Sequence, residues 1–142
     1  MFSEVFENRL VEWRSVRDSL ETCNNPLQQV IEVYKKAPRI HNKDIDLWDQ
    51  STWLDPWELI NENGYTETCV LCGICYTLQL TERFSQSKFE IINSTNIETG
   101  ETFQYLKVDN MVLQPMEGVV KNVSECPSTW ISQRIYDMQK PH

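Results

Sequence analysis

This sequence of 142 residues is poor in the residues that several common functional sites require. It has only four glycines and two histidines, and its 13 basic residues are scattered along the chain. Phosphate-binding loops need closely spaced glycines and nucleic-acid surfaces need clustered cations, so the sequence argues against both kinds of site. It also lacks an 18-residue apolar run and a basic start followed by an apolar stretch. We therefore expect no membrane span and no secretory signal peptide.

The composition is that of a globular protein with an acidic surface. The net charge is −8, hydrophobic residues make up 40% of the chain, and Trp, Tyr and Phe occur five times each. A chain of this length suits one compact domain, so we expect residues 1–142 to fold together. The missing export signal and the odd number of cysteines, five, predict a reducing compartment.

The sequence patterns predict an α+β fold. Residues 1–38 carry apolar residues at helical spacing, which indicates a helical N-terminal part. Residues 55–123 should contain a short helix, a buried central helix and a three- to four-stranded antiparallel meander packed on that helix. A C-terminal helix is predicted over 127–140, because the large apolar residues from Trp130 to Met138 can share one helical face.

Local signals indicate where these elements begin. Asp55, followed by Pro56 and then Glu58, has the arrangement of a capping box at a helix start. Thr66 can cap the buried helix in the same way. Asp109-Asn110 is a two-residue turn signal, so we expect a hairpin there.

Three of the five cysteines, Cys69, Cys72 and Cys75, fall within the buried helix. Cys69 and Cys72 have the spacing of a zinc knuckle, but structural zinc usually needs a second such pair, which the sequence lacks. Cysteines three residues apart also follow one face of a helix, where free thiols pack as small hydrophobic groups. Packing explains the segment without any chemistry, so we expect no cofactor.

The cysteine segment also resembles the Cys-x-x-Cys-Gly-x-Cys loop of bacterial-type ferredoxins. In that family a distant Cys-Pro can supply the fourth ligand, and Cys126 is followed by proline here. The resemblance implies one iron–sulfur cluster on Cys69, Cys72, Cys75 and Cys126. Against it, Gln79 stands where a local fourth cysteine would be, and the flanking residues fit a continuous helix.

A second resemblance is to the core of transglutaminase-like and papain-like folds, in which a cysteine begins a buried helix that antiparallel strands follow. It implies Cys69 as a nucleophile, since a helix start favours the thiolate. It also implies a histidine base on the second strand, where this chain has Thr102-Phe103-Gln104, and an acid on the next strand, which Asp109 could imitate. The only histidines are His41 and His142. A thiol without a base in reach is not activated, so the resemblance favours a degenerate core.

Three tryptophans, Trp48, Trp53 and Trp57, lie close together in the sequence. Aromatic residues that stay exposed anchor protein interfaces, so they form a candidate binding patch. The alternative is that they cover the end of the hydrophobic core.

We therefore predict a non-catalytic protein that acts in protein interaction, structure or assembly. Residues 55–60, Asp-Pro-Trp-Glu-Leu-Ile, resemble a segment of small uncharacterised proteins of tailed phages and marine viruses. That resemblance implies a viral origin, other viral structural proteins as partners, an oligomeric assembly, and a location in the virion or the host cytoplasm. Two alternatives remain open: a single-cluster iron–sulfur electron-transfer protein, and a transglutaminase- or papain-like cysteine enzyme that uses Cys69.

Overall fold

The computed structural model describes residues 1–41 and 44–141. In this part of the chain four α-helices precede a five-stranded antiparallel sheet, which confirms the predicted α+β class. The helices are α1 (Phe6–Leu20), α2 (Pro26–Tyr34), α3 (Pro56–Glu62) and α4 (Glu67–Gln79), with short 3-10 turns η1 (Gln50–Thr52) and η2 (Val123–Glu125). The strands are β1 (Phe89–Asn96), β2 (Thr102–Val108), β3 (Met111–Gln114), β4 (Val119–Asn122) and β5 (Trp130–Asp137).

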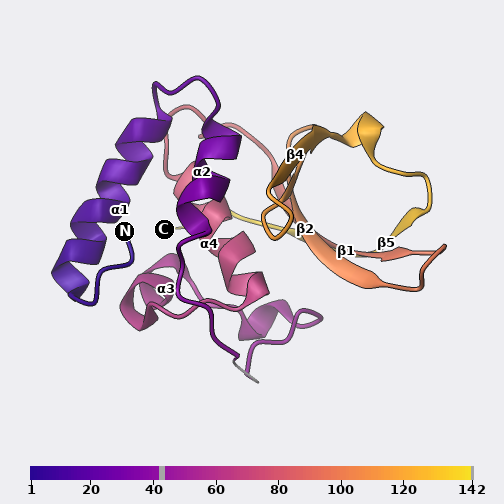
Figure 1. Ribbon diagram of the computed structural model, residues 1–142, viewed down its shortest axis with the longest axis horizontal. Helices are drawn as coiled ribbons and strands as arrows, with labels where there is room; N and C mark the ends of the chain where they lie inside the picture. The colour runs from indigo at the N-terminus through magenta and orange to yellow at the C-terminus, as the bar shows by residue number, and fades with distance from the viewer. Residues whose placement is uncertain (42–43, 142) are drawn as a thin grey trace.

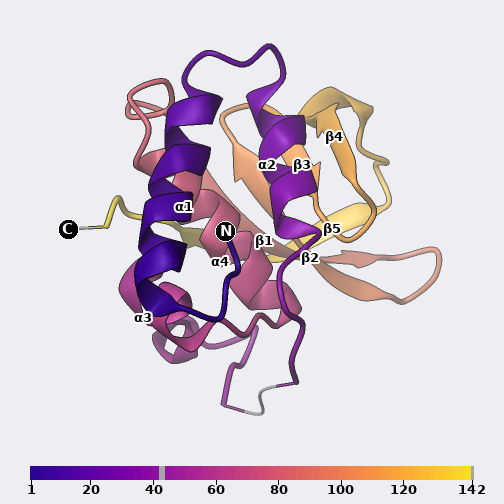
Figure 2. The same cartoon turned by 60° about the vertical axis from the view of Figure 1, so that its left-hand side comes forward.

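The helices lie on one side of the molecule and the sheet on the other, with α4 between them. Figure 1 shows this division, and Figure 2, turned by 60°, shows α4 behind α1 and α2. Helix α4 contacts the other three helices and also β2. Every residue of α4 from Thr68 to Gln79 is buried, as expected for the central helix of the core. No helix among the described residues is long and apolar enough to cross a bilayer.

The predicted caps are confirmed and set the starts of the two helices next to the site. The Asp55 carboxylate accepts from the Glu58 backbone N–H at 2.8 Å, and the Glu58 side chain accepts from the Asp55 backbone N–H at 3.1 Å. Asn63, with a φ of 50°, ends α3 in the left-handed conformation. The Thr66 hydroxyl then accepts from the Cys69 backbone N–H at 3.1 Å, so α4 starts only a few residues later.

The C-terminal helix predicted over 127–140 is wrong, because residues 130–137 form strand β5. The sheet has the order β4-β3-β2-β1-β5. After β4 the chain passes through η2 to the opposite edge of the sheet, where β5 pairs antiparallel with β1. Residues 131–135 are all exposed on this edge strand. Since an exposed edge strand buries few of its side chains, the alternation that marks a strand is missing from its sequence.

The two faces of the sheet carry two separate apolar clusters. The face toward α4 contributes Phe89, Ile91, Leu106, Val108 and Leu113 to the main core. The opposite face holds a smaller cluster of Ile92, Tyr105 and Val112, which Phe103, Trp130 and Cys126 cover. The arch from β4 through η2 to β5 encloses this smaller cluster, as the ring of strands in Figure 1 illustrates.

Candidate functional site

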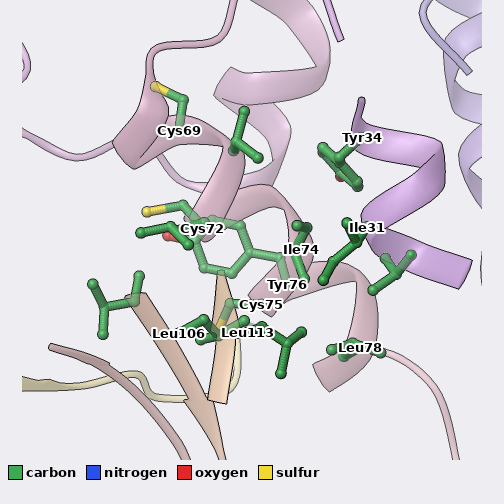
Figure 3. Close-up of a cluster of buried hydrophobic side chains, with 14 of the residues drawn as sticks. Ile31, Tyr34, Cys69, Cys72, Ile74, Cys75, Tyr76, Leu78, Leu106 and Leu113 are labelled. Carbon is green, nitrogen blue, oxygen red and sulfur yellow. The ribbon is translucent and has the colours of Figure 1, made fainter. Parts of the chain in front are cut away.

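The cysteines proposed as metal ligands do not form a ligand set. Figure 3 shows Cys69, Cys72 and Cys75 along α4 among apolar side chains, with Cys75 next to Leu106 and Leu113 of the sheet. Cys126 belongs to the cluster on the opposite face of the sheet. Among the described residues no group of three or more His, Cys, Asp or Glu side chains could hold a metal ion. The structure therefore gives the iron–sulfur interpretation no site.

The three α4 thiols are buried, and for two of them burial disfavours the thiolate. Cys69 is 3% exposed, Cys72 is 1% exposed and Cys75 is fully buried. Burial, and next the neighbouring cysteine, raise the pKa of Cys72 and of Cys75 far above that of an ordinary thiol. Because the thiolate is the reactive form, these two cysteines act as packing groups.

The residue of α4 that faces the second strand is Thr68 rather than Cys69. The Thr68 hydroxyl donates to the Gln104 side-chain carbonyl on β2 at 2.8 Å. Cys69 lies one residue further on, about 100° around the helix, and packs in the main core. The start of α4 therefore presents the Thr68 hydroxyl to β2, whereas the resemblance to transglutaminase-like and papain-like folds implied a thiol.

Gln104 is one of the three residues, 102–104, among which the resemblance implied a histidine. Its Cα is paired with that of Asn93 on β1, so the two amides are neighbours on the face of the sheet toward α4. The Asn93 amide N–H donates to the Leu47 carbonyl at 2.8 Å. The Asn93 Oδ1 and Gln104 Nε2 atoms are buried and have no hydrogen-bond partner among the described residues. Thr68, Gln104 and Asn93 thus form an uncharged polar row from the helix into the sheet.

This polar row borders a cleft of about 700 Å³ at the start of α4. Ile40, Ile45, Leu47 and Phe103 form its apolar walls, and Thr68 and Gln104 line it. The rim carries charged groups: Arg39 lies 3.9 Å from Glu67, and His41 is exposed beside them. His142, the other histidine, lies outside the described residues.

The three tryptophans have different surroundings. Trp48 is 42% exposed and follows Leu47 of the cleft wall. The indole N–H of Trp53 donates to the Asp46 carbonyl at 2.8 Å, and its ring packs on Tyr136. Trp57 is 53% exposed and meets the ring of Trp13 edge-on. Trp53 is thus a structural residue, while Trp48 and Trp57 remain candidates for an interface.

Comparison with solved structures identifies the fold of this chain. No family model and no curated protein matches this sequence. Among solved structures, LapG of Legionella pneumophila superposes with a TM-score of 0.67 at 14% identity, over 94% of this chain and 77% of that chain. Its EGTA-treated form gives a TM-score of 0.69 at 16% identity, over 92% and 73% of the two chains. Its calcium-bound form gives 0.66 at 15% identity, over 91% and 74%.

LapG has a transglutaminase-like cysteine protease fold. The chain described here has the same fold. This agrees with the resemblance drawn from the cysteine at the helix start and the strands that follow. The likeness extends well beyond the residues that suggested it, because it covers 94% of this chain.

The sequence pointed to the helix that begins beside the cleft and named Cys69 as its candidate there, and the structure adds Thr68. A cysteine in a sequence suggests a nucleophile or a metal ligand, whereas a threonine such as Thr68 suggests neither. One clue was available: Thr66 as the cap makes Thr68 the second helical residue, and Gln104 falls where the base was expected. Three residues of the apolar walls, Ile40, Ile45 and Leu47, lie outside the helices and strands, where no local pattern predicts their position.

Proposed function

We propose that this chain is a non-catalytic version of the transglutaminase-like cysteine protease fold that binds a segment of another protein in the cleft at the start of α4. The observation that carries this proposal is the 2.8 Å hydrogen bond between the Thr68 hydroxyl and the Gln104 carbonyl. A thiol and an imidazole at these two places could exchange a proton and form a nucleophile. A hydroxyl and a carboxamide cannot, because neither ionises near neutral pH.

The chemistry of the cleft supports binding. Its apolar walls can hold an aliphatic side chain, and the exposed Ile40 extends that surface. The Gln104 side chain also lines the cleft, and its carboxamide places a polar group beside these walls. A partner segment that inserts an aliphatic residue and brings its polar backbone next to Gln104 fits both features.

The proposal is tested by selecting random displayed peptides against the whole chain. Selected peptides should lose affinity at least about tenfold with Gln104→Leu, because that change removes the carboxamide that lines the cleft. Gln133→Leu, on the exposed edge strand β5, is the matched control and should leave binding unchanged. Mass spectrometry should find the bound peptides intact. If no selected peptide responds to Gln104→Leu, binding in the cleft is disproved.

A cysteine enzyme that uses Cys69 is the second candidate, and the likeness to LapG favours it. Cys69 lies in the first turn of α4, where the helix dipole favours a thiolate, but its side chain is 3% exposed. Timed alkylation with iodoacetamide at neutral pH separates the two candidates. Selective, rapid modification of Cys69, together with peptide cleavage that Cys69→Ser abolishes, would establish the enzyme and overturn the non-catalytic proposal.

A double substitution provides a positive control. Thr68→Cys with Gln104→His installs the two groups that the resemblance implied, at positions already in hydrogen-bond contact. We expect the introduced thiol to be alkylated at least about tenfold faster than any native α4 cysteine, because an adjacent imidazole stabilises the thiolate. The viral origin, the viral structural partners and the location in a virion or host cytoplasm remain predictions from the sequence.

A further inference from the structure

One edge of the sheet stays open beside the cleft. Strand β2 pairs with β1 along its whole length, but it pairs with β3 only over Leu106–Val108. Residues 102–105 of β2 therefore have a neighbouring strand on one side only, and Figure 2 shows the β1–β2 hairpin extending past β3 and β4. From this stretch Thr102, Phe103 and Gln104 line the cleft at the start of α4. The open edge of β2 is thus a wall of the same cleft.

The backbone groups that point outward from this edge belong to Thr102 and Gln104. In an antiparallel pair of strands, opposite residues alternate between pairs that exchange hydrogen bonds and pairs that do not. The Asn96 N–H donates to the Glu101 carbonyl at 2.9 Å, so the next pair along β2, that of Thr102, is a non-hydrogen-bonded one. The pair of Gln104 has the same character because it lies two residues further on. The N–H and C=O groups of both residues therefore point away from β1, toward the side that β3 leaves open.

Strand β3 does not extend far enough to cover these groups. It ends at Gln114, and its register with β2 would place Pro115 opposite Gln104. Proline has no N–H, and the Pro115 carbonyl accepts from the Gly118 N–H at 3.1 Å within the turn that leads to β4. Among the described residues, no strand pairs with Thr102 or Gln104 on this side, and no backbone hydrogen bond from outside the sheet reaches them. Such a row of unpaired backbone groups is a template for another extended chain.

We propose that the partner segment binds as an extended strand that adds to the open edge of β2; this inference rests on the proposed function. Backbone groups of the segment exchange hydrogen bonds with Thr102 and Gln104, at the positions that β3 does not reach. The segment residue opposite Gln104 places its side chain on the face toward α4, where Ile40 and Ile45 line the cleft. The next residue lies on the other face of the sheet, beside the Phe103 ring. The site therefore selects extended segments with an aliphatic residue and excludes helical ones, whose backbone groups bond within the helix.

The test uses the tightest displayed peptide selected against the whole chain, synthesised in forms that each carry one N-methyl group, placed at successive backbone nitrogens. We expect the affinity to fall at least about tenfold at every second position across the bound residues, because alternate amides of a strand face its neighbour. The intervening positions should bind within about threefold of the unmodified peptide. Isothermal titration calorimetry measures the affinities, and the protein itself is unchanged throughout this series.

Matched variants of the chain test the same hydrogen bonds from the protein side. Thr102→Pro removes the outward N–H of an exposed residue and keeps an extended backbone, so it should weaken binding at least about tenfold. Thr102→Val keeps this N–H and should bind like the unmodified chain. Ile135→Pro changes a residue of the exposed edge strand β5 whose N–H also points away from β1, so it should leave binding unchanged. Circular dichroism checks that each variant is folded.

The outcomes separate this inference from the proposed function. If N-methylation has no alternating effect, or if a folded Thr102→Pro variant binds like Thr102→Val, the added strand is disproved, and a loss with Gln104→Leu still shows binding in the cleft. If Thr102→Pro does not fold, the N-methyl series alone decides. If no selected peptide responds to Gln104→Leu, the proposed function is disproved and this inference is overturned with it.

Discussion

The polar groups on the two sides of helix α4 differ in whether they have hydrogen-bond partners. Toward the helical layer, the Thr77 hydroxyl donates to the Gly73 carbonyl at 2.7 Å, accepts from the Trp13 indole N–H at 2.9 Å, and lies 3.0 Å from the Tyr34 hydroxyl. Toward the sheet, at the two ends of the same helix, Gln104 and Gln79 each keep one buried atom without a partner.

This difference separates stability from function. Polar groups that only hold a core together are satisfied by other groups of the chain, because each unpaired buried group costs free energy. Unpaired groups persist where something else supplies the partner. The four predictions below test this division, from the largest expected effect to the smallest.

The largest effect is expected for Thr77→Val, which keeps the shape of the side chain and removes its hydroxyl. The Trp13 indole N–H and the Tyr34 hydroxyl, both buried, would lose this partner. We expect the free energy of unfolding to fall by about 3 kcal/mol, because each orphaned group costs roughly 1–3 kcal/mol. Urea unfolding followed by circular dichroism measures it. A loss under about 1 kcal/mol would mean that the satisfied side of α4 is not the stabilising one.

Gly73→Ala should come next. A Cβ atom at this position would lie 2.6 Å from Cε1 of Tyr34, and edge contacts with Phe2 and Tyr65 hold that ring in place. We expect a loss of about 2 kcal/mol, since the overlap outweighs the better helix propensity of alanine. Gly100→Ala is the comparison: it has open space around it and a φ of 73°, so only the backbone term of about 1 kcal/mol applies. Equal losses in both variants would contradict the close packing.

The third prediction concerns pH and the sheet-facing thiols. Burial raises the pKa of Cys72 and Cys75 above the ordinary value of 9.0, so the folded chain keeps protons that the unfolded chain releases. Their stabilisation is therefore complete below about pH 9 and is lost as the pH rises further, with a slope of about 1.4 kcal/mol per pH unit for each thiol.

Urea unfolding between pH 8 and pH 9.5 measures this slope, and comparison with a thiol variant separates the thiols from the tyrosines, several of which also have a raised pKa. Cys75→Ala should reduce the slope by about one proton, whatever its effect on stability at pH 7. A slope that Cys75→Ala does not alter would show that other groups govern the alkaline transition.

The smallest effect on stability is expected for Thr68→Val. Its hydroxyl bonds only to Gln104, in a partly buried place beside the cleft, so we expect a loss of less than about 1 kcal/mol. The same substitution of threonine by valine at position 77 is its matched comparison within one helix. A loss at position 68 as large as that at position 77 would make the polar row a structural feature and weaken the proposed function.

The parts of the fold that the sequence predicted are those defined by neighbouring residues. The Asp55 capping box, the Thr66 cap and the Asp109 turn each depend on contacts within a few positions. Strand β5 depends on β1, some 40 residues earlier, and its own side chains face solvent. A pattern of burial cannot be read from residues that are not buried.

The candidate site illustrates the same limit. The resemblance noted in the sequence identified the helix, its position before the strands and the absence of a histidine at the start of the second strand. It could not choose between Thr68 and Cys69, because the choice depends on the rotation of α4 against β2, which the packing of Gly73 on Tyr34 helps to set. In the sequence Gln79 stands only where a fourth cysteine ligand would be. No local pattern indicates that its side-chain oxygen is buried without a hydrogen-bond partner among the described residues.

The place of β5 in the sheet has a consequence for how the chain folds as it leaves the ribosome. Strands β1 to β4 follow one another as hairpins, so their pairing involves short loops and can form quickly. The outer edge of β1 stays open until residues 130–137 have been synthesised, because only β5 pairs with it. During that interval the nascent chain presents an uncovered strand rich in Ile, Asn, Ser and Thr, which is the stage at which association with other chains competes with folding.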